Sequence, residues 1–340
     1  MATVTVKVGG DTVTASYGGR PSGPGIVPYE SLTPRSSVSA TANQVPPVSQ
    51  VSFPVGVLEF IDFNDARSNN YGFGAYFQPQ VGGLRGSGVG QTVFQMRPNT
   101  STRASEIPAQ ATGDTNNLSL MRIGGNGSTV RSPILSGYTL RGTNQGHLYN
   151  GQIIYMATNA QISDIEILAI PGNASSQPGE TFGNNDYRSK GSLYQRMLID
   201  GQGVGASGFG GNLGSDLTVL DSVSKNNPYS AGWTCNTYSN IAYRRVAALD
   251  NGKMGFNFER VSGAVLLDNC TMLRNKTYHI NIANDQSTAN YKIVDPVFDG
   301  AKLNVKVSGF AGNPMTQNIN TIDLFINGVE RPDLLNLIRG

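Results

Sequence analysis

A few carboxylates are the residues of this chain that could do acid–base chemistry. Glu180 and Asp186 lie in one polar segment, and Glu259 lies further along the chain. Hydrolysis of a glycosidic bond needs two carboxyl groups about 5–10 Å apart, one as acid and the other as base or nucleophile. These three residues are the candidate catalytic residues, and pairing them requires a fold that brings remote segments together.

A step of 23 or 24 positions indicates what that fold is. Three series keep this step: Asn227, Asn251, Asn275 and Asp299; Phe209, Trp233, Phe256 and Ile280; and Leu217, Ile241 and Val265. Such self-similarity is typical of a stacked array, in which each repeat buries its apolar face against its neighbours. The Asn/Asp series is expected to form a structural ladder, because stacked amides hydrogen-bond along the stack. The sequence therefore predicts an all-β parallel solenoid with about 24 residues per coil.

The same step places a set of polar side chains on neighbouring coils. Asn236 and Glu259 are 23 positions apart, so they are expected to stack. Arg188, Trp233 and Asn257 are expected to share that surface. Amides hydrogen-bond sugar hydroxyls, and an aromatic ring packs against sugar C–H groups. These five residues are the candidate glycan-binding residues.

Two of these residues also have a structural interpretation. Trp233 falls within the apolar series, which favours a position inside the tube slightly over one on its surface. Glu259 precedes Arg260 and could form a surface ion pair worth less than about 1 kcal/mol. Cys235 and Cys270 are expected on different corners of the coil, too far apart for a disulfide, as free buried thiols.

Composition divides the chain into four parts. Residues 1–50 combine a Val/Thr alternation, typical of a strand or hairpin, with a Pro/Ser-rich tract, and are predicted to be an N-terminal attachment arm and linker. Residues 51–80 hold five of the thirteen Phe residues and are predicted to cap the open end of the solenoid. The coils are expected over residues 81–300, and residues 301–340 are expected to be a C-terminal cap or interface segment.

Two polar segments and the tail depart from the repeat. The segments 97–117 and 171–191 are predicted to be loops on one side of the solenoid, where binding residues of such folds often lie. The tail is expected to form strands over 302–307 and 321–326, followed by a short amphipathic helix over 332–338.

Charge and composition exclude several classes of function. Charged residues make up only 14%, and the net charge of +2 comes without a basic stripe, which argues against nucleic-acid binding. The first residues lack the apolar core of a signal peptide, and no apolar run is long enough to span a membrane. With two histidines and two cysteines, no metal site or cofactor is expected.

Several stretches resemble a known superfamily. They are GLRGSGVGQTVFQM (83–96), TLRGTNQGHLYNG (139–151), PGETFGNNDYRSKGS (178–192), GQGVGASGFG (201–210) and GFNFERVSG (255–263). Through them the chain resembles, over about residues 55–300, the pectate-lyase-like right-handed parallel β-helix superfamily. More narrowly, it resembles the β-helical minor tail proteins of phages that infect actinobacteria.

The resemblance implies a structural protein of a phage tail tip or spike that contacts the host cell envelope by binding its glycan. It implies docking to other tail proteins through the N-terminal arm, assembly as a homotrimer, and synthesis in the host cytoplasm. Two alternatives are a polysaccharide lyase or hydrolase and a bacterial envelope or adhesin module. Catalysis is the weaker expectation, because the Asp-Asp, Gly-His-Gly and Arg-Ile-Lys motifs of galacturonan hydrolases are missing, and His147 lies in a polar bend typical of a structural residue.

Overall fold

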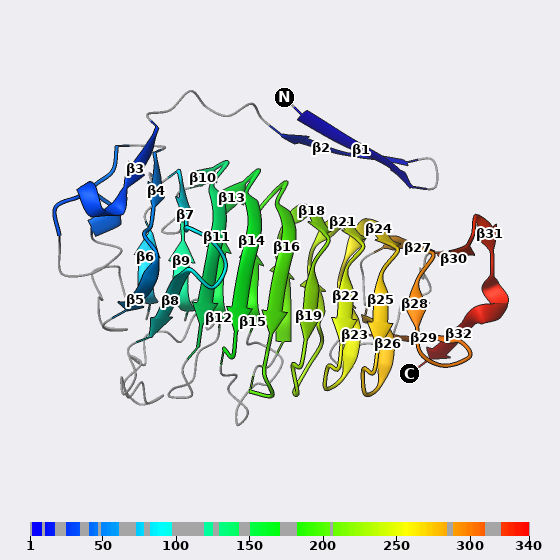
Figure 1. Ribbon diagram of the computed structural model, residues 1–340. Helices are drawn as coiled ribbons and strands as arrows, with labels where there is room; N and C mark the ends of the chain where they lie inside the picture. Colours follow the sequence, from blue (N-terminus) through cyan, green and yellow to red (C-terminus); the bar gives the residue numbers. More distant parts are fainter. Residues whose placement is uncertain are drawn as a thin grey trace.

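The computed structural model shows a right-handed parallel β-helix (Figure 1). The expected all-β solenoid is therefore confirmed. The structure describes residues 2–8, 11–17, 25–34, 41–46, 49–60, 73–77, 82–96, 119–124, 129–142, 150–170, 182–204, 207–283, 288–309 and 321–339. Most central coils contribute three short strands, so the tube has three faces.

The first face is a ten-stranded sheet in which every pair of neighbours is parallel. Its strands are β6 (Phe73–Phe77), β9 (Ser119–Ile123), β12 (Asn150–Tyr155), β15 (Phe182–Tyr187), β17 (Ser207–Asn212), β20 (Trp233–Asn236), β23 (Met254–Glu259), β26 (Tyr278–Ala283), β29 (Leu303–Ser308) and β32 (Leu335–Arg339).

The other two faces are built from strands that follow the strands of the ten-stranded sheet along the chain, and those of the third face are the shortest. The second face holds β18 (Ser215–Leu220), β21 (Ser239–Arg244), β24 (Ser262–Asp268), β27 (Ala289–Val294) and β30 (Ile322–Ile326). The third face holds β19 (Val223–Lys225), β22 (Ala247–Leu249), β25 (Thr271–Leu273) and β28 (Val297–Phe298). Three longer strands run over both faces: β11 (Ile134–Arg141), β14 (Gln161–Leu168) and β16 (Leu193–Asp200).

The register between strands follows the repeat in the centre of the chain. Leu217 lies beside Ile241, which lies beside Val265, in the second face. Trp233 lies between Phe209 and Phe256 in the ten-stranded sheet. Paired residues are further apart in the sequence towards the N-terminus. Gln161 pairs with Leu193, and the segment 171–181 between them lies outside the described residues.

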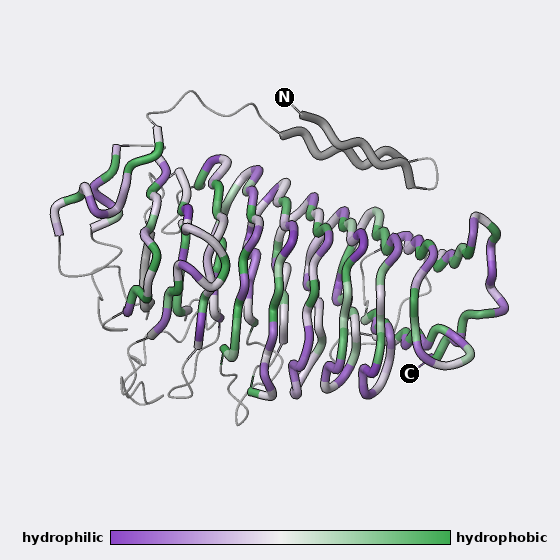
Figure 2. The backbone as a smooth tube through the Cα atoms, viewed as in Figure 1, coloured by the Kyte–Doolittle hydropathy of each residue, from purple (hydrophilic) through white to green (hydrophobic). Residues whose placement is uncertain are grey.

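Aromatic rings fill the centre of the tube. The ring of Trp233 lies 5.5 Å from that of Phe209 and 5.7 Å from that of Tyr243, which in turn lies 5.2 Å from Phe256. Hydrophobic segments recur in successive coils (Figure 2). Because each strand alternates its side chains, every coil adds apolar groups to one continuous core. Cys235 and Cys270 are free and buried, as the sequence predicts.

The expected Asn ladder forms over three of its four members. The Asn227 side-chain amide donates to Asn251 Oδ1 (2.8 Å), and the Asn251 amide donates to Asn275 Oδ1 (2.9 Å). Asp299 does not continue the ladder. Its carboxylate accepts from the main-chain N–H of Arg274 (2.8 Å) and contacts His279 Nε2 at 2.8 Å. The ladder ends at Asn275, because its side-chain amide donates to the carbonyl oxygen of Ala248 at 3.0 Å and not to Asp299.

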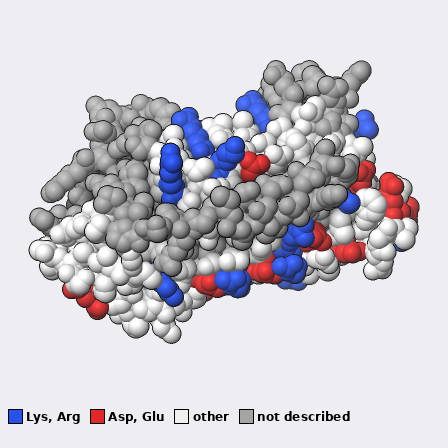
Figure 3. All heavy atoms as spheres, turned by 90° about the horizontal axis from the view of Figure 1, so that it is seen from above, with Lys and Arg blue, Asp and Glu red and all other residues white. Residues whose placement is uncertain are grey.

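Charged pairs brace the bends between the second and third faces. Arg196 forms a two-pronged ion pair with Asp164, and Arg245 forms one with Asp221. The Arg245 guanidinium holds the pKa of the Asp221 carboxyl below its ordinary value. Acidic and basic side chains alternate along one margin of the molecule (Figure 3). These arginines adopt the left-handed conformation (φ 50° and 51°), which Gly, Asn and Asp adopt more readily.

The N-terminal part differs from the expected linker. Strands β1 (Ala2–Val8) and β2 (Asp11–Tyr17) form an antiparallel hairpin, which confirms the strand pattern. Within the Pro/Ser-rich tract, β3 (Ile26–Pro28) pairs in parallel with β4 (Gln50–Ser52). A 3₁₀ turn, Tyr29–Ser31, follows β3, and the Tyr29 ring stacks on Phe53 at 5.0 Å. The tract is therefore part of the first coil, because its few apolar residues cover the apolar surface that the end of the solenoid would otherwise expose.

Parallel stacking also begins and ends beyond the predicted limits of 81 and 300. At the N-terminal side, β4 pairs with β7 (Gly83–Arg85), and β5 (Gly56–Phe60) pairs with β8 (Thr92–Met96). At the other end, β29 pairs with both β26 and β32. The predicted helix over 332–338 is wrong. That segment is a 3₁₀ turn, Pro332–Leu334, followed by β32, because pairing with β29 satisfies its backbone.

The remaining strands are short. They are β10 (Val130–Arg131), which pairs in parallel with β13 (Ala157–Thr158), and β31 (Val329–Glu330), which forms an antiparallel hairpin with β30. Across the described residues, no helix has the length and apolar character that a membrane span requires.

Candidate functional site

The outward side of the ten-stranded sheet carries a continuous set of amides. Asn212, Asn236 and Glu259 form one column, since Asn212 pairs with Asn236 and Asn236 pairs with Glu259. Asn257 and Asn281 form a second column beside it. We call these residues, together with Asn185 on β15, the amide face. Strand alternation places them outward because the residues between them, such as Phe258, are buried in the core.

Hydrogen bonds tie the amide face together across the coils. Glu259 Oε2 accepts from the Asn236 amide, and its Oε1 accepts from the Asn257 amide, both at 2.9 Å. The Asn281 amide donates to Asn257 Oδ1 at 2.8 Å. These bonds hold the side chains in one geometry, so a ligand would meet a preorganised surface.

The two columns differ in their exposure. Asn236 and Glu259 are half-buried, as is Asn212. Asn257 and Asn281 are only 7% and 8% exposed. The accessible part of the amide face is therefore the column Asn212–Asn236–Glu259, and the second column supports it from the side.

An aromatic pair extends the outward side towards the N-terminus. The rings of Tyr155 and Tyr187 stack with centroids 5.1 Å apart. The guanidinium of Arg122 lies over Tyr155 at 4.2 Å, and that of Arg188 lies 5.3 Å from the Tyr187 ring. Arg188 is exposed just after β15, whereas both tyrosines are buried. Arg188 therefore lies beside the amide face and can meet a ligand there.

Three sequence-predicted residues thus meet on one surface, and three others of the face, Asn185, Asn212 and Asn281, were missed. Asn236, Asn257 and Glu259 are in mutual contact through hydrogen bonds. Asn212 and Asn281 belong to the same surface. Asn212 and Asn281 could have been predicted from the 24-residue step, because Asn212 precedes Asn236 by one step and Asn281 follows Asn257 by one step.

Trp233 does not belong to the candidate glycan-binding face. Its side chain is 0% exposed, and its ring Nε1 donates to the carbonyl oxygen of Ala247 at 2.9 Å. In the strand β20 it shares the inward side with Cys235, whereas Asn236 points outward. The assignment of Trp233 as an aromatic plate for sugar is therefore wrong, and its structural interpretation holds.

Asp186 is likewise unable to serve as an exposed catalytic acid. Its carboxylate lies inside the tube, where it accepts from the Tyr238 hydroxyl (2.8 Å) and the Ser192 hydroxyl (3.2 Å). Loss of solvation on burial raises the pKa of this carboxyl above its ordinary value, and the hydroxyl donors oppose that effect. Asp186 is a structural acceptor inside the core, two coils from Tyr238.

The other acid–base candidates supply no second carboxylate. Glu180 lies outside the described residues, as do His147 and the polar segments 97–117 and 171–181. On the outward side of the ten-stranded sheet, Glu259 is the single carboxylate among the described side chains. Burial raises the pKa of the Cys235 thiol to about 12, so it is no nucleophile at neutral pH. Within the described part of the chain, no cluster of three or more His, Cys, Asp or Glu side chains could hold a metal ion.

Comparisons with known proteins identify the fold and no family. No family model matches the chain, and no curated protein matches its sequence. Solved structures do match. An alginate lyase from Paenibacillus sp. is 10% identical with a TM-score of 0.56, over 93% of this chain and 97% of that one. The A-module of a mannuronan C-5 epimerase from Azotobacter vinelandii is 12% identical with a TM-score of 0.51, over 92% and 97%.

A viral protein is also among the similar structures. ORF18 of Geobacillus virus E2 is 8% identical with a TM-score of 0.53, and the match covers 88% of this chain. The chain spans only 60% of the length of that viral protein. At such low identities, these likenesses establish the parallel β-helix fold alone.

Proposed function

We propose that this chain is a phage tail protein that contacts the host cell envelope by binding a glycan on the amide face. The observation that carries the proposal is the accessible column of Asn212, Asn236 and Glu259. Between coils, the Asn212 amide donates to Asn185 Oδ1 and the Asn236 amide donates to Glu259 Oε2. The resemblance of the sequence to β-helical minor tail proteins of actinobacteriophages supports the virion assignment. The β-helix of the Geobacillus virus protein agrees with it at the level of fold.

The chemistry of the column fits a glycan with many hydroxyl groups. Each amide offers both donors and an acceptor, and a carboxylate accepts from hydroxyls. The coils lie about 4.8 Å apart, so a chain of sugars running along the tube would meet one polar residue per coil. Arg188 adds a cation beside Tyr187 at one end of the surface.

Loss of the column should weaken binding without unfolding the chain. We expect the double variant Asn236→Ala, Glu259→Gln to bind purified host cell walls at least about 10-fold more weakly, since each lost hydrogen bond to a charged group is worth about 1.5–3 kcal/mol. The matched control is Asn290→Ala, an exposed amide on the second face. Co-sedimentation with cell walls measures binding, and circular dichroism checks folding. Equal retention of the double variant and the control would rule out the amide face as the binding surface.

Binding rather than cleavage is the function that the site geometry favours. Hydrolysis needs a pair of carboxyl groups, and both oxygens of Glu259 already accept hydrogen bonds from amides. A lyase or hydrolase is the alternative, and the release of soluble oligosaccharide from host envelope glycan by the intact chain would favour it. A bacterial envelope or adhesin module is the other alternative. Detection of the chain in purified phage particles would exclude it.

We propose that the N-terminal hairpin attaches the protein to other tail proteins. Strands β1 and β2 pair with each other, and their register pairs none of their residues with the coils. Deletion of residues 1–17, which removes the hairpin and spares β3, is expected to leave the coils folded and to stop incorporation into the particle. Incorporation of the shortened chain at the normal level would overturn this assignment.

We propose that copies of the chain self-associate, as a homotrimer, through the third face. Its outward side carries an apolar stripe of half-buried residues, namely Leu198, Val223, Ala247, Leu249 and Leu273. Ion pairs of balanced charge flank it, Arg245 with Asp221 on one side and Arg274 with Asp250 on the other. An apolar strip between neutral rims fits a second copy of itself better than a charged partner.

Introducing a charge into the stripe should therefore disrupt the assembly. We expect Leu249→Asp to reduce the mass measured by light scattering from that of a trimer to that of a monomer, because an unpaired carboxylate would be buried in the interface. Asn290→Asp, on the second face, is the control that adds the same charge elsewhere. A wild-type chain that is already monomeric at micromolar concentration would contradict the proposal.

A further inference from the structure

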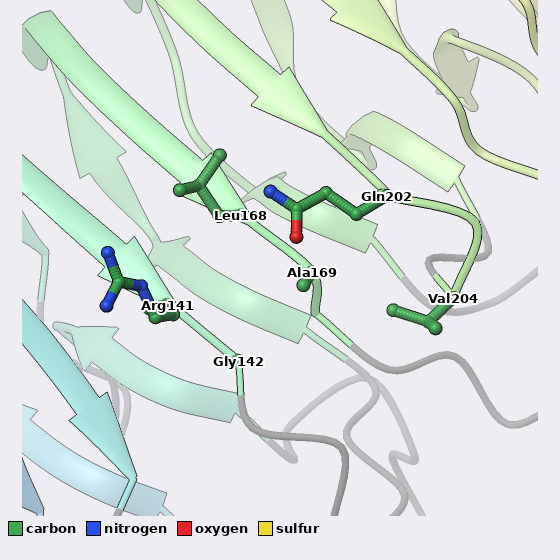
Figure 4. A pocket seen from close by; sticks show the side chains of 6 residues that line it. All are labelled: Arg141, Gly142, Leu168, Ala169, Gln202 and Val204. Atoms are coloured by element: carbon green, nitrogen blue, oxygen red, sulfur yellow. The ribbon is translucent and has the colours of Figure 1, made fainter.

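A pocket of about 420 Å³ lies where β11 and β14 end. Its lining residues are Arg141, Gly142, Leu168, Ala169, Gln202 and Val204, and we call it the corner pocket. In Figure 4, Leu168 and Ala169 lie between the Arg141 guanidinium on one side and Gln202 and Val204 on the other. The pocket thus has an apolar floor with polar groups at opposite edges.

The strand register places no carboxylate directly beside Arg141 on the two neighbouring strands. Arg141 lies beside Gln95 on one side and Leu168 on the other. Further along the same column, Lys225 lies beside Asp200 and pairs with its carboxylate at 3.3 Å. Arg141 is exposed, and no described side chain hydrogen-bonds or ion-pairs with it. Its charge is available for a ligand.

The opposite edge of the pocket is fixed by the turn after β16. The main-chain N–H of Gln202 donates to Asp200 Oδ1 at 3.0 Å, and the Val204 N–H donates to the Gly201 carbonyl at 2.9 Å. Asp200 is itself engaged by Lys225, so it adds no free negative charge to the rim. The Gln202 side-chain amide remains free to donate and accept.

The floor of the corner pocket is formed where the coil of Gly142 packs closely against the coil of Leu168. Gly142 donates its main-chain N–H to the Leu168 carbonyl at 2.8 Å. A Cβ at this position would lie 2.1 Å from the Ala169 carbonyl oxygen, so only glycine allows the two coils to meet here. The floor is therefore a fixed feature of the β-helix.

We propose that the corner pocket binds an acidic sugar. Arg141 would hold the sugar carboxylate through a two-pronged hydrogen bond, which suits the planar guanidinium. Gln202 would bind a hydroxyl, and Leu168 with Val204 would pack against the sugar C–H face. A cavity of this size takes one or two sugar units. The site is distinct from the amide face, so it can bind whether or not that face does.

Titration of the full chain with methyl glucuronide and with methyl glucoside tests the proposal. We expect ligand-observed NMR to show glucuronide binding at least about 10-fold tighter than glucoside binding. A hydrogen bond between charged groups is worth about 1.5–3 kcal/mol, which corresponds to a factor of about 10 or more in affinity. Arg141→Gln should weaken glucuronide binding about 10-fold or more. Arg131→Gln, an exposed arginine at the end of β10 that does not line the pocket, should leave it within about twofold.

Three results would overturn the proposal. Equal binding of glucuronide and glucoside would show that the carboxylate is not recognised. Unchanged glucuronide binding in Arg141→Gln would place the site elsewhere. Inorganic phosphate that displaces glucuronide at equal concentration would show a general anion site rather than a sugar site. The amide-face variant Asn236→Ala, Glu259→Gln should retain glucuronide binding, which separates failure of this proposal from failure of the amide face.

Discussion

Replacement of Trp233 by alanine is expected to lower the free energy of unfolding by about 3–5 kcal/mol. The side chain is fully buried, and its ring packs between those of Phe209 and Tyr243 on neighbouring strands. Its removal leaves a cavity in a tube where each coil rests only on its neighbours, so remote parts of the chain cannot compensate. The Ala247 carbonyl also loses the hydrogen bond from the indole N–H. Urea denaturation followed by circular dichroism measures the change.

Two measurements separate this result from the surface interpretation of Trp233. Tyr229→Ala is the control, because that ring is 39% exposed, and we expect a change below about 1 kcal/mol. Trp233 is the only tryptophan, so its fluorescence reports on this site alone. We expect blue-shifted emission that iodide does not quench. A Trp233→Ala chain of unchanged stability that no longer binds cell walls would instead place the indole on the surface.

Replacement of Asn251 by alanine is expected to cost about 2–5 kcal/mol of stability. The Asn227 amide would lose its acceptor on residue 251, and Asn275 Oδ1 would keep only the main-chain N–H of residue 251 as a donor. Each unpaired polar group in a buried site costs about 1–3 kcal/mol. Neighbouring coils would thus both be affected by a single substitution. The same denaturation experiment on the variant gives the value.

An exposed amide pair provides the matched control for the ladder. The Asn336 amide donates to Asn304 Oδ1 at 2.7 Å on the outside of the last coil. Water can replace that bond, so Asn336→Ala should cost less than about 1 kcal/mol. Asn251→Asp should be destabilised at neutral pH and recover as the pH falls towards about 4, because the protonated carboxyl can donate to Asn275. Equal costs for Asn251→Ala and Asn336→Ala would show that the ladder contributes nothing beyond a surface bond.

Much of the solenoid could be predicted from the sequence, because its contacts recur at a regular step. Trp233 and Phe256 lie beside each other in the structure, and Asn227 bonds Asn251, since identical chemistry one coil apart stacks on itself. The amide face could be predicted in part for the same reason, as Asn236 and Glu259 show. Where the 24-residue spacing is interrupted, the sequence no longer predicts the secondary structure correctly. The segment after Pro332 reads as an amphipathic helix, yet it pairs with β29 as one more strand.

The sequence by itself determined the repeat, the buried columns and the near-neutral polar surface, because these depend on residue type and on spacing along one chain. The tertiary structure decided which side of each strand faces outward and which charges meet. It placed Trp233 and Asp186 inside the tube and put Gln95 and Leu168, not a carboxylate, directly beside Arg141. The physical reason is that the offset between coils changes at each insertion. Neighbours that are 24 positions apart in one coil are 32 apart in another, and no local pattern reports that shift.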